Sequence, residues 1–174
     1  MTDLTAPARD DWGVRRTKDI SWYDPMISAN AATRLPGREF LQAIADGRLP
    51  RPPFADLVGA RLHSVADGEV VFRCTPDEST YNPGGIVHGG LLCMLLDSAC
   101  GCSVQSTLPS GAGISTIEIK VSFLSALRAG GGELEVTGKV LRVGRQVAFA
   151  EAHARNGDGK LVGHASSSIA VIRQ

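Results

Sequence analysis

The feature that most constrains the fold is an apolar segment in the middle of the chain, residues 89–108. Leucine, methionine, alanine and cysteine dominate it and β-branched residues are few, so a helix is predicted. Apolar side chains cover nearly every side of that helix, which requires burial on most sides. A chain of 174 residues is long enough to bury such a helix within one domain.

Strand-like patterns on both sides of this segment predict what surrounds the helix. Residues 117–123 alternate apolar and polar side chains with a period of two, and three further stretches are strand-like: 133–142, 146–155 and 161–172. Asp67-Gly68 is a hairpin signal between two earlier strands. This order predicts an α+β fold in which an antiparallel β-sheet wraps around a long central helix.

An N-terminal arm with a short helix, residues 1–47, is expected to precede the main domain, residues 48–174. The segment 1–35 is polar and irregular, but its tryptophans predict an arm that packs on the body or on a neighbouring subunit. The spacing of apolar residues predicts a helix over residues 36–47. The prolines at positions 50, 52 and 53 predict an extended connection after it.

Charge and cysteine usage exclude several classes of function. Lys+Arg and Asp+Glu both number 18, so no net field attracts nucleic acid or an anionic membrane. The N-terminus has acidic residues and no apolar core, so no signal peptide is expected. The four cysteines lack zinc-site spacing, which predicts free thiols in the cytoplasm, no metal and no cofactor.

The candidate site begins where the central helix begins. Glycine is unfavourable inside a helix, yet Gly89 and Gly90 make sense at a helix start, where the first amides have no intrahelical partner. A glycine amide can approach a ligand oxygen closely, which is the requirement of an oxyanion hole. A capping turn that only serves helix packing is the alternative.

Asp97 lies on the same apolar helix, where an unpaired carboxylate would be costly to bury. The alternative is an ordinary aspartate with a hydrogen-bond partner. Eight residues separate Gly89 from Asp97, which is ~12 Å along a helix. One chain therefore cannot bring both to one carbonyl carbon, and the pair predicts a dimer or is not a catalytic pair.

The pattern Asn82-x5-His88-Gly89-Gly90-x6-Asp97 resembles the hotdog-fold acyl-CoA thioesterases of the phenylacetate-degradation (PaaI-like) branch. The resemblance covers residues 48–171 and includes the strand segment 113–124. It implies a homodimer, or a homotetramer as a dimer of dimers, with sites at the dimer interface. The partners it implies are an acyl-CoA substrate and water, with neither nucleic acid nor a membrane.

The resemblance also implies roles for individual residues. Asn82 and Gly89 would bind the thioester oxygen, His88 would hold the loop, and Asp97 of the facing subunit would activate water or attack directly. Ser115 would orient the water. Its parity with the apolar residues of 117–123 also predicts that it faces the core, where a structural hydrogen bond is the alternative role.

Residues that would bind the rest of the substrate carry weaker signals. Gly90, Lys120, Arg128 and Arg145 are the substrate-binding candidates, and each of the three cations is alternatively a solvated surface charge. Asn82 alone would be a turn former and His88 alone a helix-entry residue. Cys93, Met94 and Cys100 are expected to line the acyl pocket.

Two other functions remain open at this stage. A hotdog hydratase or dehydratase would use a differently spaced His and acid, and a non-catalytic acyl-CoA-binding protein would not need the acid. Product analysis with an enoyl thioester distinguishes a hydratase or dehydratase from a thioesterase. Binding of acyl-CoA without release of the thiol identifies a non-catalytic binding protein. The absence of a G-x-S-x-G elbow argues against an α/β-hydrolase, and the absence of a dinucleotide fingerprint argues against a nucleotide enzyme.

Overall fold

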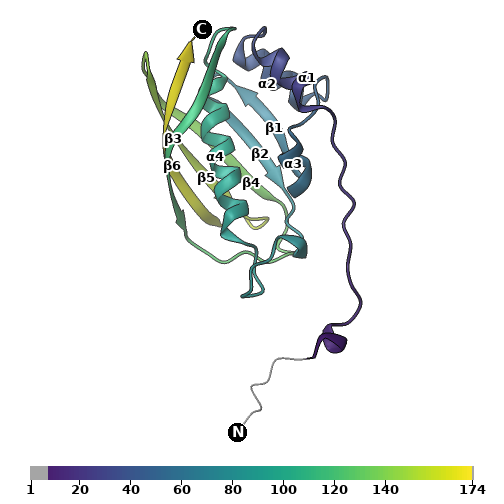
Figure 1. Cartoon of the computed structure of the whole chain (residues 1–174). Helices are drawn as coiled ribbons and strands as arrows, with labels where there is room; N and C mark the ends of the chain where they lie inside the picture. The colour runs from purple at the N-terminus through teal and green to yellow at the C-terminus, as the bar shows by residue number, and fades with distance from the viewer. Residues whose placement is uncertain (1–7, 174) are drawn as a thin grey trace.

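The computed structural model describes residues 8–173 as a six-stranded antiparallel sheet curled around one long helix (Figure 1). The strands are β1 (Ala60–Ala66), β2 (Glu69–Cys74), β3 (Ala112–Phe123), β4 (Leu134–Val143), β5 (Val147–Arg155) and β6 (Leu161–Arg173). Their order in the sheet is β1-β2-β4-β5-β6-β3, so β1 and β3 form the two edges. The α+β hotdog arrangement expected from the sequence is confirmed.

The central helix α4 (Gly89–Gln105) is buried on most sides, as its composition predicts. Leu95, Leu96 and Ala99 are fully buried against the concave face of the sheet. Helix and sheet approach closely at Gly138 of β4, where an added Cβ would lie 2.1 Å from the carbonyl oxygen of Ala99. Backbone therefore meets backbone there, which lets the sheet curl tightly around the helix.

One strip of α4 is not covered by the sheet. Met94, Asp97 and Ser98 are only partly buried, and they line a cavity that also includes residues of both edge strands. Figure 1 shows α4 between the edge strands β1 and β3, and the cavity lined by both strands leaves Asp97 accessible.

Three short helices precede the sheet: α1 (Pro25–Ala32), α2 (Gly37–Ala45) and α3 (Pro53–Val58). The predicted helix over residues 36–47 is confirmed by α2, which buries Leu41 and Ile44. The extended connection predicted for the prolines is wrong beyond residue 52, because Pro53 occupies the first position of α3. Proline is well tolerated there, since that amide needs no intrahelical partner. The irregular prediction for 1–35 also missed α1.

The arm before α1 contacts the body through charges rather than through its aromatic residues. Lys18 pairs with Asp77 at 2.7 Å, and Arg16 pairs with Glu78. Trp12 and Trp22 are 70% and 61% exposed, so they do not pack on this chain. The short helix η1 (Arg9–Trp12) lies far from the sheet in Figure 1, and residues 1–7 lie outside the described part.

The four cysteines are free thiols. Burial raises the pKa of Cys74 to about 11 and that of Cys100 to about 12, so both stay protonated at neutral pH. Within residues 8–173, no helix is long and apolar enough to cross a membrane. No group of three or more His, Cys, Asp or Glu side chains in that same range is placed to hold a metal ion.

Replacement of Gly138 by alanine is expected to lower the free energy of unfolding by at least ~1–3 kcal/mol, because the new methyl group would overlap the α4 backbone. Gly113→Ala is the matched control, since a Cβ at that strand position meets no atom within 4 Å. Urea unfolding of both variants measures the difference. Equal stability of the two variants would contradict the close contact between β4 and α4.

Candidate functional site

Asn82 forms a compact turn that leaves its side-chain nitrogen, Nδ2, unpaired within the described residues. Its side-chain oxygen accepts from the backbone N–H of Gly84 at 2.9 Å and from that of Ile86 at 3.5 Å. This is an Asx-type turn, in which the side-chain oxygen accepts hydrogen bonds from backbone N–H groups of the loop. The side-chain Nδ2 has no hydrogen-bond acceptor within residues 8–173 and remains available as a donor.

Neighbouring segments hold this loop in place on both sides. The backbone N–H of His88 donates to the Thr80 carbonyl at 2.8 Å, and that of Val87 donates to the Leu127 carbonyl at 2.9 Å. The Tyr81 hydroxyl accepts from the Ala129 N–H at 2.7 Å. The donor at Asn82 is therefore fixed relative to the start of α4, as a preorganised site requires.

His88 is the N-cap of α4. Its Nδ1 accepts from the backbone N–H of Gly90 at 2.8 Å, which satisfies one of the free amides of the first turn. The predicted contribution of Gly90 to substrate binding therefore cannot come from its amide, which the cap already uses. The amide of Gly89 has no acceptor within the described residues, so it is the free donor of this turn.

The space around both glycines explains why no side chain stands there. An added Cβ at Gly90 would lie 3.0 Å from the capping nitrogen of His88. One at Gly89 would lie 3.0 Å from the ring of Phe123. The His88 cap and Phe123 of β3 thus leave little room for a side chain at either glycine.

Asn82, His88 and Gly89 line one cavity of about 430 Å³. Another wall consists of Phe123, the last residue of β3, and residues 124–127, which follow it. Asn82 and Gly89, which carry the two unpaired N–H donors, line this space at the N-terminal end of α4, where the helix dipole is positive. The arrangement suits an oxygen that carries or develops negative charge.

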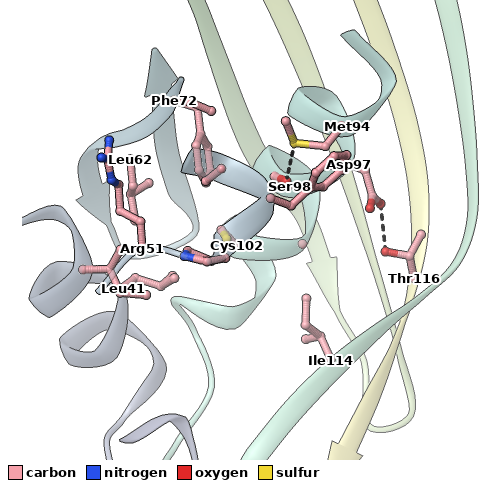
Figure 2. Close-up of a pocket in the computed structure, with 16 residues that line it drawn as sticks. Leu41, Arg51, Leu62, Phe72, Met94, Asp97, Ser98, Cys102, Ile114 and Thr116 are labelled. Atoms are coloured by element: carbon pink, nitrogen blue, oxygen red, sulfur yellow. Dashed lines mark hydrogen bonds between the residues drawn. The ribbon is translucent and has the colours of Figure 1, made fainter. Parts of the chain in front are cut away.

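Asp97 lies two turns further along α4, at a second cavity of about 270 Å³. The Thr116 hydroxyl donates to its Oδ1 at 2.9 Å, as Figure 2 shows. The carboxylate is partly exposed and retains its second oxygen for other partners. It can therefore accept a proton or a water hydrogen while Thr116 fixes its orientation.

The strand register corrects the prediction for Ser115. Thr116 lies opposite the fully buried Ile169 and so faces α4, whereas Ser115 lies opposite Ala170 and points to the outer face of the sheet. A β-bulge between Thr116 and Glu118 inserts one residue, Ile117, which is 59% exposed. The inserted residue reverses which face of the sheet the odd-numbered side chains point to. The alternation of residues 117–123 therefore does not extend back to Ser115.

The two cavities share no lining residue within one chain. Asn82 and Gly89 belong to one, and Asp97 and Thr116 belong to the other. The ~12 Å rise from Gly89 to Asp97 along an α-helix agrees with this separation. Within one chain these two groups of residues, here called half-sites, therefore lie apart.

The three cationic candidates lie in different places. Arg128 is beside the Asn82 loop, where its guanidinium donates to the Gly85 carbonyl at 3.4 Å. Lys120 pairs in register with Ser166 and faces outward. Arg145 lies in the β4–β5 turn, at the end of the sheet where β3 begins. Gly89 packs near Phe123, where β3 ends, so the two residues are at opposite ends of the sheet. Of these three side chains, only Arg128 hydrogen-bonds to the Asn82 loop within the described residues.

The cavity at Asp97 only partly matches the expected lining. Met94 contributes, but Cys100 is fully buried in the core and Cys93 is not among the residues that line the cavity. Cys102, one turn beyond Ser98, takes their place. Burial, with a smaller effect from Asp97, raises the pKa of the Cys102 thiol to about 12, so it is not a nucleophile at neutral pH.

Comparison with known proteins identifies the family. The sequence model described as the Thioesterase superfamily matches residues 84–163. A solved protein from Ralstonia eutropha, titled a proposed thioesterase related to phenylacetic acid degradation, has a TM-score of 0.68 and 30% identity; the match covers 75% of this chain and 98% of that one. The proposed esterase PA0474 of Pseudomonas aeruginosa is 32% identical over 66% of this chain and 84% of its own. The chain belongs to the thioesterase superfamily.

More distant and partial relatives agree with this assignment. Human acyl-coenzyme A thioesterase 13 is 28% identical over 72% of this chain and 86% of its own. A proposed esterase of Halobacterium salinarum is 37% identical over 54% of this chain, and this match spans 64% of that relative's length. The match to the superfamily includes His88, Gly89 and Asp97 but begins after Asn82 and after α1–α3.

The N-cap role of His88 predicts a stability change that is separate from activity. His88→Ala is expected to lower the free energy of unfolding by ~1 kcal/mol, because the Gly90 amide loses its acceptor. His88→Asn should retain most of that stability, since asparagine is a good N-cap. Urea unfolding compares the two. An equal loss in both variants would show that His88 stabilises the helix by some other contact.

Proposed function

We propose that this protein is an acyl-CoA thioesterase, which hydrolyses R-CO-S-CoA with water to the free acid and CoA. The observation that carries the proposal is the pair of unpaired donors, Asn82 Nδ2 and the Gly89 amide, on one cavity. Membership of the superfamily and the similarity to human acyl-coenzyme A thioesterase 13 support the substrate class.

In this proposal the two donors bind the thioester oxygen and stabilise its negative charge as the carbonyl carbon is attacked. Asp97 acts as general base, taking a proton from the attacking water and returning it to the departing sulfur, or attacks the carbon itself to form an anhydride that water then hydrolyses. The electrons of the broken C–S bond leave with the CoA sulfur. Thr116, rather than Ser115, orients the acid, because Thr116 faces α4 and binds the carboxylate.

The complete site is proposed to form between two chains. The two half-sites of one chain lie in separate cavities, so Asp97 of a second copy must supply the acid to Asn82 and Gly89. Edge strand β3 pairs only with β6 among the described strands, which leaves its outer edge for a partner strand. Ile117 and Leu124 near this edge are more than half exposed.

Roles in CoA binding are proposed for the cationic side chains. Arg128 is proposed to bind the CoA phosphates at the cavity of its own chain, and Arg145 to reach the cavity of a partner. Lys120 is a less suitable ligand because it faces outward. A homotetramer built from two dimers, a cytoplasmic location and a boundary between residues 47 and 48 remain predictions.

Replacement of Asp97 by asparagine is expected to reduce kcat by roughly 10²–10⁴-fold, because the amide cannot accept a proton. Thr116→Ala should reduce it by roughly ten- to a hundredfold through loss of a hydrogen bond to a charged group. Release of CoA thiol from a series of acyl-CoA esters measures both. Size-exclusion chromatography checks that each variant keeps the oligomeric state of the wild type.

Ser115→Ala is the matched control for Thr116→Ala, since it removes a hydroxyl from the neighbouring residue on the opposite face of β3. It should retain activity close to that of the wild type. Near-full activity of Asp97→Asn would contradict the role of the acid. An equal loss in Ser115→Ala and Thr116→Ala would contradict the assignment of Thr116.

A further inference from the structure

The cavity at Asp97 has a polar side and an apolar side. Asp97 and Thr116 lie together on one side, and Leu41 lies on the other beyond the strip of α4 that forms the floor (Figure 2). The far wall comes from α2, through Leu41 and Ile44, and from Phe72 of β2. An occupant whose reacting carbon is near Asp97 would therefore extend its remaining atoms toward α2.

No unpaired cation lines this cavity in the described part of the chain. Arg51 is the only basic residue among those that line it, and its guanidinium pairs with Asp56 at 2.7 Å. The Ser98 hydroxyl contacts the Met94 sulfur at 3.5 Å. A carboxylate at the far end of an occupant would lose its hydration without gaining a partner, which is costly. The lining thus suits an uncharged, apolar group.

The size of the cavity limits the occupant. Its volume of about 270 Å³ is nearly twice that of the roughly 150 Å³ engineered cavity, in another protein, that binds benzene. An aliphatic chain or an aryl group with roughly six to ten carbons is therefore the right bulk. A longer chain would meet Leu41 and Ile44, which are buried in α2 and not free to move away.

We propose that this cavity is the acyl pocket for an uncharged apolar acyl group, and that helix α2 sets the longest chain the enzyme accepts. The proposal rests on the thioesterase function proposed above and deepens it. The wall that sets the length, residues 41 and 44, precedes residue 84, where the match to the superfamily begins. The length limit is therefore a property of the part of this chain that the superfamily match does not include.

The test measures kcat/KM for acetyl- through palmitoyl-CoA, with succinyl-CoA as the anionic counterpart of butyryl-CoA. In the wild type, kcat/KM should rise by about fourfold for each added methylene group until the chain reaches α2. Ile44→Phe should shift the optimum to shorter chains, and Ile44→Ala should shift it to longer ones. Acetyl-CoA, which is too short to reach the wall, should show the smallest change in kcat/KM of all the esters in both Ile44 variants.

Glu39→Phe is the matched control, because Glu39 lies on the exposed face of α2 and does not line the cavity. It should leave the chain-length optimum unchanged. An optimum that stays the same in both Ile44 variants, with acetyl-CoA hydrolysis intact, would overturn the role of α2 while leaving the thioesterase function standing. Succinyl-CoA hydrolysed as well as butyryl-CoA would overturn the apolar pocket. Hydrolysis of none of the esters by the wild type would overturn both proposals.

Discussion

The burial of α4 governs the rest of the structure. A helix that is apolar on nearly every side must be covered on nearly every side, and a single sheet achieves this only by curling around it. The contact of Gly138 with the backbone of Ala99 shows how closely the two approach. Because the two edges of the curled sheet do not meet, one strip of α4 stays open, and the helix carries Asp97 on that strip.

The same helix explains why the candidate site is divided. Its first turn supplies the unpaired Gly89 amide and the dipole, and Asp97 lies two turns later. A rigid helix keeps these groups ~12 Å apart, so they cannot converge within one chain. Because of this separation, the two groups line different cavities. Pairing of two chains is then a chemical requirement of the proposed reaction, and not only a way to bury the apolar residues near the β3 edge.

The sequence predicts the parts of the fold that depend on periodicity and composition. The buried helix, the six strands and the Asp67-Gly68 turn follow from local patterns, and so does the position of Gly89 at the helix start. What the sequence could not reveal is the bulge at Ile117, because an inserted residue leaves the apolar–polar alternation on either side intact. Because of that single inserted residue, Thr116 rather than Ser115 contacts the Asp97 carboxylate. The placement of α2 over the far end of the cavity was equally hidden, since it depends on long-range packing.

Subunit complementation tests the divided site most directly. Asp97→Asn and Asn82→Ala chains would each be inactive alone, and they would be unfolded together in equal amounts and refolded to form mixed dimers. A mixed dimer holds one site with Asn82 from the first chain and Asp97 from the second, so about a quarter of wild-type activity should return. Activity that stays at the level of the separate variants, with mixed dimers verified by native mass spectrometry, would contradict a site shared between two chains.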